Sequence, residues 1–129
     1  FSAAVSDFKV KNKSQTKIKK EEALNLNLEK NVDILNYVSN HNSLRPKLVI
    51  GFAAETNDLD ENAIIKLNSK NCDWIIANDI SKKNKGFNSD FNEVTIHYKN
   101  SKKKKEKLSC KRKSEISEEI VDRIVSQFN

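Results

Sequence analysis

The sequence predicts an α/β domain of three layers, in which a mostly parallel β-sheet is covered by helices on both faces. Segments with strand character alternate along the chain with segments of helical character, and this order implies right-handed crossovers. Two predicted strands, 47–52 and 73–80, contain continuous apolar runs, which are typical of strands covered on both faces. A later segment, 93–98, alternates between apolar and polar residues and is predicted to be the one antiparallel edge strand.

The amino-terminal third is predicted to contain two strands and one helix. Residues 2–8 resemble a strand, and 24–28 alternates with the period of two expected for a strand with one buried face. Between them, 9–20 is rich in lysine and shows no apolar period, so we expect a loop. Asn31 is a suitable N-cap for a helix that extends to about His41.

The rest of the chain is predicted to supply two longer helices. The first begins at Thr56 or Asn57 and has an inner face of Leu59, Ala63 and Leu67, which recur every four residues. The second begins at Ser114, with an inner stripe of Ile116, Ile120, Ile124 and Phe128. This arrangement of elements is Rossmann-like or ribokinase-like, and in such sheets ligands bind at the carboxyl ends of the strands.

Charge, hydropathy and cysteine spacing argue against several classes of function. The net charge of +6 is compatible with nucleic-acid binding, but only three arginines are present, and base-edge recognition relies on arginine. The basic run 102–113 is therefore predicted to be a solvated turn or strand end. No stretch approaches the roughly 18 apolar residues of a membrane span. Cys72 and Cys110 lack a CxxC spacing, which disfavours a zinc site and suits the reducing cytoplasm.

Three short motifs together resemble those of a known enzyme family. They are GFAAET at 51–56, AND at 77–79 and GFNSD at 86–90, and Lys66 and Lys70 lie between the first two. Their order and spacing resemble the carboxyl-terminal part of phosphopantothenate–cysteine ligase, also called phosphopantothenoylcysteine synthetase. In most bacteria this ligase is fused behind a flavin-dependent decarboxylase. The resemblance covers nearly the whole chain.

The resemblance implies a reaction in coenzyme A biosynthesis. The carboxylate of 4′-phosphopantothenate attacks CTP to give an acyl-cytidylate and pyrophosphate, and the amine of L-cysteine then displaces CMP. Because carboxylate and triphosphate are both anionic, lysines and Mg²⁺ are expected to neutralise their charge. FMN is expected only in a fused decarboxylase domain outside this sequence. The family also implies a homodimer.

The resemblance carries the family's nucleotide-binding roles to matching residues here. Lys17 is the expected catalytic residue, reaching the α-phosphate as its loop closes like a lid, with a plain solvated loop as the alternative. Asp7 is expected at the ribose or at Mg²⁺, with a turn cap as the alternative. Phe52 is expected beside the base unless it belongs to the core. Lys66 and Lys70 lie one helical turn apart and are expected at the triphosphate unless they form an ordinary solvated face.

A helix start is expected to line the cytidine pocket. Val32, Asp33, Ile34 and Leu35 match the family segment with this role, and the unpaired N–H groups of a helix start suit an anion or a base edge. The family usually has proline at the position of Val32, so the pocket is expected to be slightly looser here. No residue is assigned to a metal, and the roles of Lys19, Lys20, Asn78 and Asp79 stay open.

One departure from the family limits what the chain is expected to do alone. The family's glycine-rich loop and asparagine-bearing motif are missing from these 129 residues, which are predicted to form a single domain, the carboxyl-terminal part of a larger ligase domain. The chain alone is therefore expected to bind nucleotide without catalysing ligation. Two alternatives remain open. One is a non-catalytic domain for dimerisation or partner binding, with 24–28 as a pairing strand, and the other is a basic nucleic-acid module.

Overall fold

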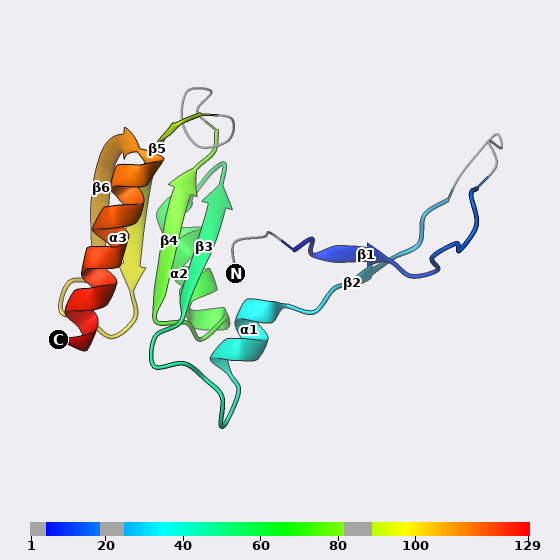
Figure 1. Cartoon of the computed structure of the whole chain (residues 1–129), viewed down its shortest axis with the longest axis horizontal. Helices are drawn as coiled ribbons and strands as arrows, with labels where there is room; N and C mark the ends of the chain where they lie inside the picture. The colour runs from blue at the N-terminus through cyan, green and yellow to red at the C-terminus, as the bar shows by residue number, and fades with distance from the viewer. Residues whose placement is uncertain (1–4, 19–24, 82–88) are drawn as a thin grey trace.

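A four-stranded sheet with one helix on each face forms the main body of the computed structural model, which describes residues 5–18, 25–81 and 89–129 (Figure 1). The strands lie in the order β3 (Ile50–Glu55), β4 (Trp74–Asp79), β5 (Phe91–Tyr98) and β6 (Lys105–Arg112). Helix α2 (Leu59–Ser69) covers one face and α3 (Lys113–Phe128) the other. The three-layer arrangement predicted from the sequence is therefore confirmed.

The sheet is mixed, so the prediction of a mostly parallel sheet is wrong. Strands β3 and β4 are parallel, with Ala53 opposite Ala77, and α2 makes the crossover between them. Strands β4 and β5 pair antiparallel, as do β5 and β6. The β5–β6 connection spans only 99–104, and so short a link joins antiparallel neighbours, whereas parallel strands need a long crossover.

Strand β6 also corrects the prediction for the basic run. Residues 93–98 were expected at an edge, but β5 lies between β4 and β6, and β6 forms the edge from within 102–113. Leu108 is buried under α3, while lysines of β6 project toward solvent. Lysine on an edge strand discourages pairing with a further chain, which accounts for the charge of this segment.

Two apolar clusters lie on opposite sides of the sheet because consecutive strand residues point to opposite faces. The cluster beneath α2 comprises Val49, Ala53, Ala63, Leu67, Cys72, Ile75 and Ala77, with Leu35 and Leu59 packed against it. The cluster beneath α3 comprises Trp74, Ile76, Val94, Ile96, Leu108 and Ile116, with Ile120 and Ile124 partly buried at its margin. The predicted inner faces are thus confirmed except at Phe128, which is more than half exposed.

The amino-terminal strands form an antiparallel ribbon that extends away from the sheet (Figure 1). Its strands are β1 (Phe8–Val10) and β2 (Leu28–Lys30). The predicted strand at 2–8 begins among residues 1–4, which lie outside the described ranges. In the described part of the chain, the strand begins at Phe8, where the predicted strand was expected to end, so this boundary is wrong. Asp7 precedes β1 and is exposed.

The alternating leucines that the structure describes are not buried by other described residues, and Leu24 lies outside the described ranges. Leu26 and Leu28 are each 58% exposed, because nothing in the described chain packs on the ribbon to form the expected buried face. The predicted loop at 9–20 is confirmed in part. Its first two residues belong to β1, residues 11–18 carry no helix or strand, and Lys19 and Lys20 lie outside the described ranges.

The helix starts differ from the predicted caps. Helix α1 (Ile34–Ser39) is capped by Asp33, whose Oδ1 accepts the N–H of Asn36 at 2.9 Å, while the predicted cap Asn31 donates from Nδ2 to the carbonyl of Ser6 at 3.1 Å. Two further predicted caps are displaced: α2 follows Asp58 rather than Thr56 or Asn57, and α3 encloses Ser114 because it begins at Lys113.

An ion-pair network beneath α3 makes stability depend on pH. Hydrogen bonds from Arg123, and others from Lys103 and Tyr98, outweigh partial burial and lower the pKa of Glu106 to about 2. The Arg123–Glu106 pair is short, at 2.8 Å, and mostly shielded. Because the folded pKa lies below the ordinary value of 4.5, the pair contributes stability above about pH 4.5 that is lost as pH falls toward 2.

We therefore expect Glu106→Gln to flatten the acid dependence of stability. Wild type should lose about 2 kcal/mol more unfolding free energy than the variant between pH 7 and pH 3. Urea unfolding at the two pH values measures this difference. Glu118→Gln, which changes the same charge at an exposed position on α3, should lose stability as wild type does. Equal losses for Glu106→Gln and wild type would contradict the assignment.

Candidate functional site

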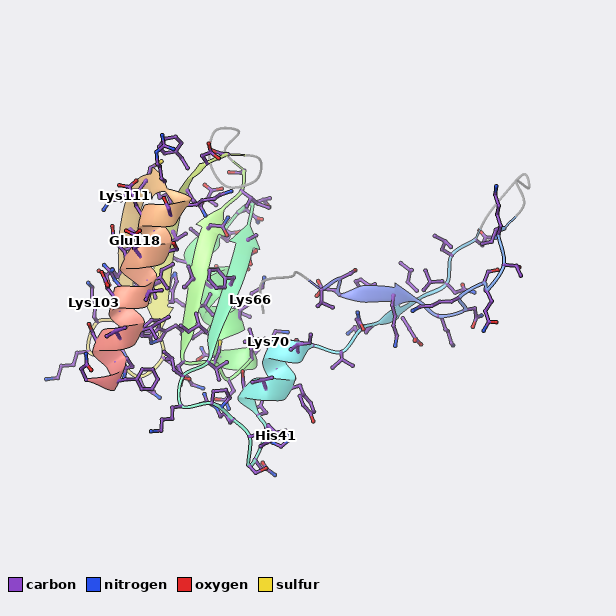
Figure 2. The ribbon with its side chains drawn as sticks, in the orientation of Figure 1. His41, Lys66, Lys70, Lys103, Lys111 and Glu118 are labelled. Carbon is purple, nitrogen blue, oxygen red and sulfur yellow. The ribbon has the colours of Figure 1, made fainter. Side chains whose placement is uncertain are left out.

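Lys66 of α2 and Lys70, the residue at the C-cap of this helix, lie on the side of the helix that faces β3 and α1 (Figure 2). Lys66 and Lys70 are separated by one helical turn, so their side chains share a face, and this face differs from the buried face that contains Ala63 and Leu67. The β3 strand, the start of α1 and this face of α2 thus meet at one place. The expectation that the two lysines act as a pair is consistent with this geometry.

Lys70 is linked to the start of α1. Its ammonium forms an ion pair with Asp33, the residue that caps this helix. Partial burial opposes ionisation of the carboxyl, but hydrogen bonds from Lys70 and from the N–H of Asn36 outweigh it, and the pKa of Asp33 is lowered. Asp33 is therefore an anion at neutral pH and holds the Lys70 ammonium at the helix start.

Lys66 is held by the end of β3. Its Nζ lies 2.6 Å from Oε1 of Glu55, whose side chain is only 13% exposed. Oε2 of the same carboxylate lies 3.4 Å from Nδ2 of Asn62. Sequence analysis missed Glu55, although its place inside the GFAAET motif, at the end of a buried strand, was the signal that pointed to it.

The glycine of GFAAET allows α1 to approach the sheet. A Cβ built on Gly51 would lie 2.5 Å from Cδ2 of Leu35 and 2.8 Å from Cδ1 of Ile75. Leu35 accordingly packs against the core beneath α2, while Ile34 and Val32 are exposed beside it. The helix start therefore offers exposed apolar side chains next to Lys70.

Phe52 lies on the other face of β3. Its neighbours Gly51 and Ala53 face α2, so the Phe52 side chain points to the opposite side and is 72% exposed. The alternative that Phe52 belongs to the core is wrong, because α3 packs over β5 and β6 and no described residue covers the Phe52 side chain on this face of β3. Phe52 and the two lysines thus flank the same strand from opposite faces.

Asp7 and Lys17 belong to the ribbon and do not join the lysine pair in this structure. The carbonyl of Asp7 accepts the N–H of Asn31 at 2.8 Å, while its side chain is exposed. Lys17 is exposed in the segment after β1, which extends away from the sheet (Figure 1).

Arg45 is a further residue that sequence analysis missed. Its guanidinium donates to the carbonyl of Ser39 at 2.8 Å, to the carbonyl of Asn71 at 3.2 Å and to Oδ2 of Asp73 at 3.0 Å. It thereby fastens the end of α1 to the turn between α2 and β4. This contact fixes α1 against α2 and so supports the meeting of Asp33 with Lys70.

The described part of the chain offers no ready metal centre and no bilayer-spanning helix. No group of three His, Cys, Asp or Glu side chains within it is arranged to hold a metal ion. None of its helices combines the length and hydropathy needed to cross a membrane. What the site does provide is two ammonium groups one turn apart beside an exposed helix start, with the Phe52 ring exposed on the opposite face of β3.

Comparison with known proteins identifies the family. Residues 1–128 match the family described as DFP, the DNA/pantothenate metabolism flavoprotein C-terminal domain. The chain belongs to this family. The resemblance found in the sequence, to the carboxyl-terminal part of the bifunctional decarboxylase/ligase, is thereby confirmed.

Relatives and a solved structure agree with this assignment. The chain is 39% identical over 127 residues to the coenzyme A biosynthesis bifunctional protein CoaBC of Haemophilus influenzae, and 38% identical over 125 residues to that of Bacillus subtilis. Each alignment covers at least 96% of this chain but only 30% of the relative. A crystal structure of the C-terminal domain of CoaBC matches with a TM-score of 0.63 at 33% identity, covering 80% of this chain and 45% of that one.

Proposed function

We propose that this DFP-family chain carries the nucleotide-binding side of a ligase that uses CTP to join 4′-phosphopantothenate and L-cysteine. The observation that carries the proposal is the meeting of Lys66 and Lys70 with the start of α1 at β3. Two ammonium groups on one side of a helix can donate charge-assisted hydrogen bonds to the oxygens of a polyphosphate. A role in coenzyme A biosynthesis is what the relatives have in common.

In the proposed reaction, electrostatics and positioning supply most of the catalysis. Lys66 and Lys70 hold the triphosphate so that the substrate carboxylate can approach the α-phosphorus without facing an unscreened anion. Pyrophosphate leaves, the acyl-cytidylate forms, and the cysteine amine then attacks its carbonyl and releases CMP. Lys17 is the residue proposed to reach the α-phosphate as its segment closes over the nucleotide.

The remaining contacts of the nucleotide are proposed from the same geometry. Val32 to Leu35 present the helix start to cytidine, where the first N–H groups of α1 have no carbonyl partner within the helix. Phe52 exposes its ring on the opposite face of β3, and we propose that it meets the base around this strand, which lies at the edge of the sheet. Since the described residues lack a preformed metal cluster, we propose that Mg²⁺ arrives with the triphosphate, with Asp7 as a carboxylate that can join its coordination.

Further parts of the ligase are proposed as partners. The chain spans 30% of the relatives' length and 45% of the solved C-terminal domain, so the rest of the ligase domain is expected to complete the site. The open face of β3 around Phe52 is available for it. We also propose a homodimer in which Leu26 and Leu28 of the ribbon are covered by a second copy. FMN belongs to a fused decarboxylase, and the two free cysteines suit the cytoplasm.

The two competing functions are less well supported. Four lysines of the basic run are paired with carboxylates: Lys103 with Glu106, Lys105 with Asp60, Lys107 with Glu93, and Lys111 with Glu119. Such pairing lowers the positive charge that this segment presents to a nucleic-acid backbone, and the family match favours the ligase. A non-catalytic dimerisation or partner-binding domain fits the exposed ribbon but gives no role to the lysine pair.

The proposal is tested by reconstituting ligation. This chain replaces the matching 127 residues of the Haemophilus influenzae relative, and pyrophosphate release and amide formation are followed with each nucleoside triphosphate. We expect both products to depend on CTP, phosphopantothenate and cysteine together. A folded chimera that binds CTP but forms no acyl-cytidylate would favour the non-catalytic alternative.

A further inference from the structure

Glu55 holds one of the two site lysines through a carboxylate that is itself held by α2. It is the last residue of β3, and its side chain lies on the α2 side of the sheet. One oxygen accepts the Lys66 ammonium at 2.6 Å, and the other faces the amide of Asn62 at 3.4 Å. Since Asn62 and Lys66 are one helical turn apart, both oxygens are engaged by the same helix.

The backbone that carries this carboxylate is fixed. Glu55 lies opposite Asp79 in the parallel pairing of β3 and β4, and its carbonyl accepts the N–H of Ile80 at 2.9 Å. The Lys66 side chain, by contrast, is long and 42% exposed. Ordering a mobile lysine side chain on a phosphate costs binding free energy, and the upper end of this cost corresponds to about a tenfold loss of affinity. Because the Glu55 carboxylate is shielded and its backbone is fixed, it orders the Lys66 side chain before the phosphate binds and so removes part of that cost.

The second lysine is held differently. Asp33, the partner of Lys70, is 40% exposed and is also the cap of α1, so the nucleotide can approach this pair from solvent. The Glu55 side chain is only 13% exposed, so ions in the solvent screen its charge little. The two ion pairs therefore differ. The carboxylate that holds Lys66 belongs to a strand of the sheet, whereas the one that holds Lys70 lies at the exposed start of α1.

We propose that Glu55 is a positioning residue that holds the Lys66 ammonium where the phosphates of the nucleotide bind. The ammonium has three N–H donors, of which Glu55 engages one and leaves the others for phosphate oxygens. Glu55 thus acts through Lys66 and does not itself touch the nucleotide. This inference rests on the proposed function, because it takes the ligand to be a nucleoside triphosphate.

A binding cycle tests the inference on the 129-residue chain. CTP and cytidine are titrated calorimetrically into wild type, Glu55→Gln, Lys66→Ala and the double variant. We expect Glu55→Gln to weaken CTP binding about fivefold and leave cytidine binding unchanged, with no further effect in the Lys66→Ala background. Glu61→Gln, the same charge change at an exposed position of α2, should bind CTP as wild type does. CTP affinity that is unchanged or tighter in Glu55→Gln overturns the proposal.

A second measurement separates this inference from the proposed function. If wild type binds neither ligand, the nucleotide proposal fails for this chain. Thermal unfolding then tests whether Glu55 acts through its contact with Lys66. Glu55→Gln should lower the unfolding midpoint of wild type but not that of Lys66→Met. An equal effect in both backgrounds would show that Glu55 does not act through Lys66.

Discussion

Lys66→Ala is expected to weaken CTP binding to this chain by about ten- to a hundredfold, the range set by losing a charge-assisted hydrogen bond in a partly buried site. The lysine is proposed to present its formal charge to the triphosphate from a helix that packing holds in place. Lys70→Ala should weaken binding less, because its partner Asp33 is 40% exposed, against 13% for Glu55, and solvent screens its charge more. Calorimetric titration at constant ionic strength measures both changes.

Two controls make this prediction specific. Cytidine, which has no phosphate, should bind Lys66→Ala and wild type alike. Lys104→Ala removes an equal charge from the exposed turn between β5 and β6 and should leave the CTP affinity within about twofold, the scatter expected of a distant surface charge. If Lys104→Ala weakens CTP binding as much as Lys66→Ala does, the affinity reflects the net charge and the lysine pair is no site.

Lys17→Gln is expected to abolish ligation while sparing nucleotide binding. A cation that meets the α-phosphate only as the segment closes stabilises the transition state more than the bound nucleotide, so its loss falls on the rate. Removing one such electrostatic contact costs about a hundred- to a thousandfold in kcat. Pyrophosphate release by the reconstituted ligase measures the rate, and calorimetry measures CTP binding, which should change only a few-fold.

The matched control for Lys17 lies in the same segment. Lys13→Gln removes an equal charge from an exposed position four residues earlier and should leave kcat near that of wild type. Equal losses in the two variants would indicate a general effect of charge on the ribbon. A Lys17→Gln enzyme with normal turnover would remove Lys17 from the catalytic machinery.

The local features of the fold follow from sequence patterns, whereas the pairing of strands does not. The four-residue spacing of Leu59, Ala63 and Leu67 correctly predicts the inner face of α2, and the apolar run at 73–80 predicts β4. The direction of β5 and the existence of β6 depend on hydrogen bonds between distant segments. The sequence of β6 does not resemble a strand, because it is rich in lysine and an edge strand with one solvated face needs few apolar residues.

The site shows the same division. The helical spacing of Lys66 and Lys70 correctly predicts a shared face, since that spacing is local. The partners of these lysines are not predictable in this way, because Asp33 and Glu55 reach them from other elements. The exposure of the Phe52 side chain is likewise not predictable from the local sequence, because it depends on which part of the sheet α3 covers.

Calorimetric titration of the 129-residue chain with CTP and then ATP, with Mg²⁺ present, tests the central claim most directly. The account predicts saturable CTP binding that is tighter than ATP binding and is weakened in Lys66→Ala. A chain shown to be folded by circular dichroism that binds neither nucleotide, alone or in the reconstituted ligase, would contradict it.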